Sequence, residues 1–236
     1  MIDFHSHILP NIDDGSRSLN ETIYMIEEAK KAGFTKIIST SHYIERYYEA
    51  DEEQRTELIN EVKENIQGIE LYLGNEIYIT NRMADLIAEK KASTINNSKY
   101  VLFELPMNNK PIDAKEIVFR LIEKGYVPII AHPERYKYVK ENIEYVRELA
   151  DMGVLFQSNY GSAIGMYGKK AQKTQKKLLE EGLIQFFGSD VHTVEQVYPK
   201  MPKILKKLRK ILTEEELQQL TTENAQKVLN NEDIEI

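Results

Sequence analysis

The chain has 236 residues, of which 42% are hydrophobic and 29% charged, as is ordinary for a globular protein with a substantial core. It contains no cysteine, which excludes disulfides, thiolate metal ligands and every mechanism that uses a cysteine nucleophile. The net charge of −7 argues against a broadly basic nucleic-acid surface but allows a local basic pocket. Because no apolar run is long enough to span a membrane and no signal-peptide pattern opens the chain, we expect a cytoplasmic protein.

Short β-rich runs alternate with amphipathic segments along the first 190 residues. We expect seven strands, at 2–7, 36–40, 69–77, 100–105, 127–131, 154–158 and 184–188. Apolar residues recur at helical spacing between them, at 19–32, 52–66, 81–91, 113–124, 142–152 and 169–181. Two further helices are expected at 202–212 and 214–230, and Thr213 is placed to cap the second. This alternation predicts an α/β fold with parallel strands joined by right-handed crossovers. We expect 1–236 to form one barrel-like domain, with a doubly wound open sheet as the alternative.

The five histidines all fall at, or within a few residues of, the C-terminal end of a predicted strand. They are His5, His7, His42, His132 and His192. That end of the strands is the rim where catalytic residues gather in α/β barrels. His5 and His7 lie two residues apart, so their rings project from one face and can chelate zinc, iron or manganese. A single histidine would be interpreted as structural, but five at one rim favour a metal site.

Carboxylates join the histidines at the same rim. Glu76 and Glu104 lie in otherwise apolar runs, where an ionised carboxylate is costly unless it is paired or bound to a metal. An ion pair with a neighbouring lysine is the alternative for each of them. Asp190 lies two residues before the last histidine, in the order Asp-Val-His.

Asp13 and Asp14 precede Gly15, and we expect one of the two aspartates to be only a turn former. The other completes a set of nine oxygen and imidazole ligands, which is too large for one ion. Such a set suits two or three metals that generate a nucleophile at neutral pH and clamp the oxygens of a phosphoryl group. Arg135 follows the fifth strand, where its guanidinium can hold phosphate through paired hydrogen bonds. A surface salt bridge is the alternative for Arg135.

Together these motifs resemble a known family. MIDFHSHILPNIDDG, STSH, GNEI, VPIIAHPER and FFGSDVH, in this order, resemble the polymerase and histidinol phosphatase (PHP) superfamily. They are most similar to its bacterial tyrosine-phosphatase branch of the CpsB/CapC/YwqE type, over residues 1 to about 192. The resemblance implies a distorted TIM-like barrel of seven parallel strands that holds three divalent ions. Those ions are expected to be manganese, with iron or zinc as alternatives.

The resemblance also implies a role for each residue. By motif position, the first ion would be held by His5, His7, Glu76 and Asp190. Glu76 would bridge to a second ion, held also by His42 and His132. The third ion would be held by Asp14, Glu104 and His192. Arg135 matches the phosphate-contacting arginine of the family. A second arginine that often follows the Asp-x-His motif is missing here, and Lys200 or Arg17 is the candidate replacement.

The expected activity is hydrolysis of phosphotyrosine, on a bacterial tyrosine kinase that controls export of capsular or extracellular polysaccharide. Tyrosinate is a fair leaving group because the pKa of the phenol is about 10. Tyrosines 43, 47, 48, 160 and 167 are expected at the mouth of the site, with ordinary surface or core positions as the alternative. Rival functions are a histidinol-phosphatase-like small-molecule phosphatase and a regulatory module that keeps its metals for stability alone. A phosphodiesterase is least favoured, given the acidic charge balance.

Overall fold

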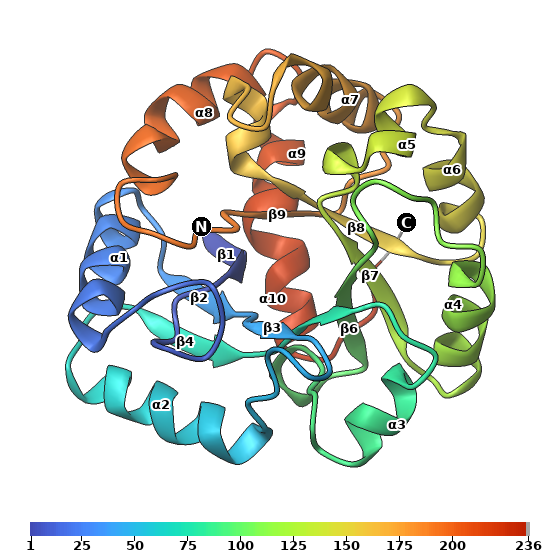
Figure 1. Cartoon of the computed structure of the whole chain (residues 1–236). Helices are drawn as coiled ribbons and strands as arrows, with labels where there is room; N and C mark the ends of the chain where they lie inside the picture. The colour runs from blue at the N-terminus through green and yellow to red at the C-terminus, as the bar shows by residue number, and fades with distance from the viewer. Residues whose placement is uncertain (235–236) are drawn as a thin grey trace.

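Parallel strands curve into a half-barrel sheet, and helices lie around its outside (Figure 1). The computed structural model describes residues 1–234. The strands are β1 (Ile2–Ser6), β2 (Lys36–Ser39), β3 (His42–Tyr43), β4 (Glu70–Leu73), β5 (Glu76–Tyr78), β6 (Tyr100–Glu104), β7 (Val127–Ala131), β8 (Leu155–Asn159) and β9 (Phe186–Gly188). One sheet has the order β1-β2-β4 and the other β3-β5-β6-β7-β8-β9, with every pair parallel. The predicted α/β alternation is confirmed.

The expected count of seven strands is not confirmed, because an unpredicted short strand follows the second expected strand and the third expected strand is interrupted. The short strand β3 follows β2 after a first break in the chain, and the third expected strand is divided by a second break into β4 and β5. The second break follows from Gly74, where a Cβ atom would lie 2.6 Å from the side chain of Ile95. At the next position the Asn75 amide donates to the carbonyl of Ser41 (2.8 Å), which joins the two breaks. The interruptions therefore redirect the two rim segments β3 and β5 together.

The sheets also meet at the opposite edge. Ser6, at the end of β1, forms an isolated parallel bridge with Val191, which follows β9. Inside this closure the rings of Phe4 and Phe186 stack with their centroids 4.2 Å apart, and both side chains are buried. The apolar interior thus lies directly beneath the ends of β1 and β9.

The predicted helices are found in place, most of them shorter at one or both ends. They are α1 (Leu19–Lys31), α2 (Glu52–Glu64), α3 (Met83–Ala88), α4 (Ala114–Glu123), α6 (Glu144–Ala150), α7 (Lys169–Glu180), α8 (Met201–Leu208), α9 (Glu214–Gln218) and α10 (Asn224–Leu229). The short helix α5 (Lys137–Glu141) was not predicted. Short 3-10 turns include η1 (Ile95–Asn97), η2 (Pro133–Arg135), η3 (Tyr160–Ile164) and η4 (Tyr198–Lys200). Among the described helices there is none with the length and apolar character needed to cross a bilayer.

The C-terminal helix covers the end of the barrel away from the rim (Figure 1). A π-helical turn at Gln219–Glu223 joins α9 to α10, so the predicted helix at 214–230 is continuous but contains one wider turn. Thr213 forms the expected cap and accepts from the backbone N–H of Glu216 (3.2 Å). Asn224, the first residue of α10, donates to the carbonyl of Gln185, just before β9 begins (2.9 Å). The rim therefore carries the polar site, while the opposite end is sealed by packing.

Candidate metal centre

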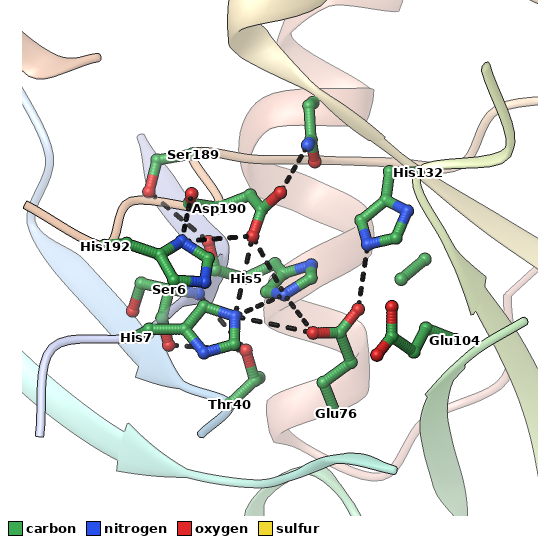
Figure 2. Close-up of polar contacts among 12 residues, drawn as sticks. His5, Ser6, His7, Thr40, Glu76, Glu104, His132, Ser189, Asp190 and His192 are labelled. Carbon is green, nitrogen blue, oxygen red and sulfur yellow. Dashed lines mark hydrogen bonds and ion pairs between the residues drawn. The ribbon is translucent and has the colours of Figure 1, made fainter. Parts of the chain in front are cut away.

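The structure brings all nine predicted ligands together at the carboxyl ends of the strands, and all of them except Asp14 and His42 are labelled in Figure 2. Each has a ring nitrogen or carboxylate oxygen within 4.0 Å of another member of the set, which comprises His5, His7, Asp14, His42, Glu76, Glu104, His132, Asp190 and His192. Three groups have ligand atoms that all lie within 4.8 Å of one another: His5, His7 and Asp190; His42, Glu76 and Glu104; and His7, Asp14, His42 and His192. Residues up to 187 positions apart thus converge only through the fold.

Glu76 lies at the centre of the cluster. Its Oε2 atom is 3.2 Å from His5 Nε2, 3.4 Å from His7 Nε2 and 3.1 Å from His42 Nδ1. Its Oε1 atom is 2.9 Å from His132 Nε2. Burial alone would raise the pKa of this carboxyl group, but His5 and His42 hold it well below its usual range. The buried Oε2 accepts no hydrogen bond from the described residues. The imidazole nitrogens that converge on it therefore fit, together with this oxygen, the ligands of a divalent cation.

The outer part of the cluster differs from the grouping implied by the resemblance. Asp14 Oδ1 lies 3.4 Å from His192 Nε2 and 3.6 Å from His42 Nε2. Glu104 lies instead beside His42 Nδ1 (3.7 Å) and groups with Glu76. Burial, and then the charge of Glu76, raises the pKa of Glu104 to about 9. A bound cation would reverse that shift, because it favours the ionised carboxylate.

Asp13 is the turn former of the aspartate pair, and it also positions two candidate ligands. Its Oδ1 accepts from the N–H of Gly15 (2.9 Å), while its Oδ2 accepts from His7 Nδ1 (2.8 Å) and from the N–H of His42 (2.9 Å). The first of these Oδ2 contacts leaves His7 Nε2 free to face Glu76. Gly15 is required for the turn, because a Cβ atom there would lie 2.2 Å from the carbonyl oxygen of His7.

Amide side chains on β8 form a layer around the cluster that the sequence did not reveal. Gln157 Oε1 lies 2.8 Å from His5 Nδ1 and can accept its proton, which orients His5 Nε2 toward the cluster. Gln157 Nε2 donates to Asn159 Oδ1 (3.0 Å), and Asn159 Nδ2 donates to Asp190 Oδ2 (2.7 Å). The available signal was alternation: two polar residues share one face at the end of an otherwise apolar strand.

A second buried network anchors the segment after β9. Asp3 accepts from the N–H of Ser189 (2.7 Å) and from the hydroxyl of Tyr198 (2.7 Å), and it is fully buried within β1. Asp190 comes next in the chain and has a left-handed backbone (φ 52°), as does His132 (φ 35°). Such conformations cost about 1–3 kcal/mol each and persist where surrounding contacts enforce them.

Arg135 lies at the edge of the cluster, as predicted. Its Nη1 contacts Asp190 Oδ2, and its Cζ lies 4.5 Å from the ring centroid of Tyr167. Although burial opposes its charge, the neighbouring carboxylate Asp190 raises the pKa of the guanidinium. The side chain keeps 26% of its surface exposed, which leaves it accessible to a ligand from the rim.

The expected ring of tyrosines is only partly found. Tyr43 in β3 and Tyr160 in η3 do not line the mouth, because both are buried among apolar side chains of the core. Tyr48 stacks on His42 with a centroid distance of 6.0 Å, and Tyr47 is 81% exposed beside it.

The two candidate replacements for the missing arginine lie in the loops around the site. Lys200 donates to the backbone carbonyls of Glu195 and Gln196, which ties its amino group to its own loop. Arg17 lies two residues beyond Gly15, and its backbone N–H donates to the carboxylate of Glu21.

Comparison with known proteins identifies the family. The model for capsular polysaccharide synthesis proteins of the CpsB/CapC type matches residues 1–230. CapC of Staphylococcus aureus is 36% identical over 238 residues, which cover 99% of this chain and 93% of that protein. YwqE of Bacillus subtilis strain 168, a tyrosine-protein phosphatase, is 33% identical over 238 residues, with the same coverage of 99% and 93%.

Solved structures agree with this assignment. A chain from the crystal structures of Bacillus subtilis YwqE and Streptococcus pneumoniae CpsB, which are metal-dependent tyrosine phosphatases, matches with a TM-score of 0.91. It is 32% identical, and the match covers 100% of this chain and 96% of that chain. An inactive dihydroorotase-like domain of Chaetomium thermophilum shares the fold alone, with a TM-score of 0.61, 11% identity and coverage of 98% and 79%. The resemblance of the motifs is confirmed: this chain belongs to the CpsB/CapC family.

Proposed function

We propose that this chain is a metal-dependent protein-tyrosine phosphatase, and that the nine clustered residues hold three divalent ions, with manganese as the expected metal. The observation that carries the proposal is the convergence of nitrogen and oxygen donors on the buried, unpartnered Oε2 of Glu76, in a chain of this family. We assign Glu76 as the bridging ligand because, within residues 1–234, it alone contacts His5, His7, His42 and His132.

When bound, the ions would supply a nucleophile at neutral pH and compensate the negative charge of the phosphoryl oxygens. The chain itself contributes orientation. Asp13 and Gln157 each fix one histidine so that its Nε2 faces inward, and Asn159 fixes the carboxylate of Asp190. Arg135 binds the equatorial oxygens of the phosphoryl group as their charge develops, by paired N–H contacts. Because tyrosinate leaves readily, this arrangement needs no strong general acid.

The proposed substrate is a phosphotyrosyl protein, and specifically a bacterial tyrosine kinase of capsular or extracellular polysaccharide synthesis. The capsule-synthesis family description supports the pathway, and the tyrosine-phosphatase relatives support the chemistry. Because phosphorylation by ATP is a cytoplasmic process, the proposed location is the cytoplasm, with recruitment to the membrane by the kinase. We propose a single domain over 1–236 in which the two sheets together form one distorted barrel.

The test is a comparison of substrates on the manganese-loaded protein. A phosphotyrosyl peptide, a phosphoseryl peptide of the same sequence and histidinol phosphate are assayed at equal concentration. The proposal predicts that kcat/KM is highest for the phosphotyrosyl peptide. Preference for histidinol phosphate would make the protein a small-molecule phosphatase, and no turnover of any of the three would favour a regulatory module.

A further inference from the structure

One face of the molecule is basic although the chain as a whole is acidic. Residues 169–210 contain eleven Lys and Arg against four Asp and Glu, in a chain whose net charge is −7. The cations belong to α7 and to the segment that contains α8, which lie next to each other at the top of Figure 1. All of these lysines are exposed, whereas most apolar side chains of both helices are buried.

The spacing of the lysines is unfavourable for the helices themselves. Lys169, Lys173 and Lys177 follow one another at i, i+4 along α7, where like charges repel across each turn. Two lysines occupy the first turn of α7, which contains no acidic residue, although a helix N-terminus favours negative charge. The α8 region repeats the pattern with Lys203 and Lys207. Helix stability therefore does not explain this arrangement.

Few of these cations are neutralised within the chain. Lys176 pairs with Glu180 (3.3 Å) and Arg209 with Glu214 (2.7 Å). Glu181, the nearest other carboxylate in sequence, is bound by Arg147 of α6. Nine lysines of the basic face make no ion pair with any carboxylate in residues 1–234, namely Lys169, Lys170, Lys173, Lys177, Lys200, Lys203, Lys206, Lys207 and Lys210.

The face is hollowed on both sides of α7. A groove of about 340 Å³ between α7 and the α8 segment is lined by Lys173, Lys176, Lys207 and Lys210. A second groove of about 280 Å³, between α5 and α7, is lined by four lysines that again include Lys173. Gln172 and Gln175 also line the first groove, and their amide nitrogens are bonded to groups of the chain itself. We call the first groove, defined by these six residues, the lysine groove.

The lysine groove begins near the proposed phosphate site. Tyr167, whose ring lies against Arg135, precedes the first residue of α7 by only two positions. From Lys169, the first residue of α7, to Lys176 in the lysine groove the helix rises by about 10 Å. An extended peptide covers that distance in about three residues, so a segment flanking a phosphotyrosine at the site can reach the lysines.

We propose that the lysine groove docks an Asp- and Glu-rich segment of the phosphotyrosyl substrate, next to its phosphotyrosine. This inference rests on the proposed tyrosine-phosphatase function and adds a specificity element to it. Charge complementarity with an acidic segment would raise the association rate and fix the peptide register. An anionic membrane is less suitable, because the large exposed apolar residues among 1–234, such as Ile112 and Phe119, lie outside α7 and α8.

The test uses the full-length, metal-loaded protein and two matched triple variants. The groove variant combines Lys173→Glu, Lys207→Glu and Lys210→Glu. The control variant combines Lys63→Glu, Lys90→Glu and Lys124→Glu, which give the same change in net charge. These exposed lysines lie in α2 and just after α3 and α4, and they make no ion pair within 1–234. Each protein is assayed with p-nitrophenyl phosphate, a phosphotyrosyl peptide flanked by acidic residues, and the same peptide with serines instead.

We expect the wild type to prefer the acidic peptide, and the groove variant to lose about tenfold in kcat/KM for that peptide alone. The preference should shrink as ionic strength rises from about 0.05 to about 0.5 M. Equal turnover of both peptides by the wild type, or an equal loss in the control variant, would overturn the docking site. A last outcome is that only the groove variant stops sedimenting with vesicles rich in phosphatidylglycerol, while its turnover of the peptides is unchanged. That result would show that the basic face binds membranes, and it would overturn the docking site too. If neither peptide is hydrolysed by the wild type, the proposed function itself fails.

Discussion

Strands β1 and β8 end at the same rim, and both carry two buried polar side chains on one face, yet they contribute differently. β1 ends in imidazoles that converge on Glu76, whereas β8 ends in amides that hydrogen-bond to the imidazole of His5 and the carboxylate of Asp190. Amides do not titrate, and they rarely bind transition metals in competition with imidazole. One strand thus supplies candidate ligands, while the other sets their orientation.

The comparison becomes testable because the two layers should fail in different ways. Removing a ligand should abolish metal binding, while removing a positioning group should weaken it and leave the ligands in place. A residue that serves the substrate should change catalysis without changing metal content. The substitutions below separate these outcomes, from the largest expected effect to the smallest.

The largest effect is expected for Glu76→Gln. As the bridging carboxylate, Glu76 should be the least replaceable ligand, so we expect loss of most bound metal and about a thousandfold or more in turnover. Metal content by mass spectrometry and steady-state kinetics provide the measurement. Glu134→Gln is the matched control, since Glu134 is also buried but binds Asn159 N–H and Ser162 instead of the cluster. Unchanged metal content in Glu76→Gln would show that the bridge is assigned to the wrong residue.

Arg135→Ala should act on catalysis alone. We expect a loss of about 2–4 kcal/mol in transition-state stabilisation, the scale of one preorganised electrostatic donor. Arg135→Lys should recover only part of it, because an ammonium cannot make paired contacts. Metal content and melting temperature should barely change. Near-normal turnover, or a loss of stability large enough to explain the kinetics, would make Arg135 a structural residue.

Gln157→Leu tests the positioning layer directly. Loss of the contact to His5 Nδ1 should weaken divalent-ion affinity by about 10–100-fold, measured by competition with a chelating dye. Gln175→Leu is the matched control, because Gln175 is a buried amide that binds Ser158 and the backbone of Asn159 without reaching a ligand. Equal affinities in both variants would remove the distinction drawn between β1 and β8.

Metal uptake should be linked to pH. The pKa of Glu104 is raised to about 9 in the absence of a cation, so at pH 7 its carboxyl group is protonated and must release a proton on binding. The pKa of His132 is lowered to about 4, so that imidazole is already neutral. Ion affinity should therefore rise with pH up to about 9, by up to tenfold per pH unit for each proton released. Calorimetry in buffers of different ionisation enthalpy counts the protons, and uptake without proton release would contradict the assignment.

The smallest effect should come from the end of the barrel opposite the site. Thr213→Ala removes a capping box and should lower the free energy of unfolding by about 1 kcal/mol. Because the C-terminal helix lies away from the rim, kcat/KM and metal content should stay the same. Urea denaturation provides the measurement, and a change in catalysis would show that the two ends of the barrel are coupled.

Sequence patterns revealed the candidate ligands because histidines and buried carboxylates are chemically conspicuous at strand ends. The choice between Asp13 and Asp14 could not be made from residue type, since both precede the same glycine and only the turn geometry separates them. Gln157 and Asn159 were missed because an amide in a strand has no charge whose burial must be explained.

The strand count failed for a different physical reason. The third expected strand reads as one apolar run, yet it breaks at Gly74, where the side chain of Ile95 from another segment approaches closely. Periodicity reports which face of a strand is buried, but it carries no information on such long-range contacts. Tyr43 and Tyr160 illustrate the same limit, since their burial depends on neighbouring strands.

The central claim is that the clustered imidazoles and carboxylates hold divalent ions that make this chain a tyrosine phosphatase. The most direct test is to strip the purified protein with excess EDTA, dialyse it exhaustively, and assay phosphotyrosyl peptide before and after adding back single metals. We predict no turnover in the stripped protein, recovery that is greatest with manganese, and no effect of thiol-alkylating reagents, because the chain has no cysteine. Full activity of the stripped protein in excess EDTA would contradict the metal mechanism.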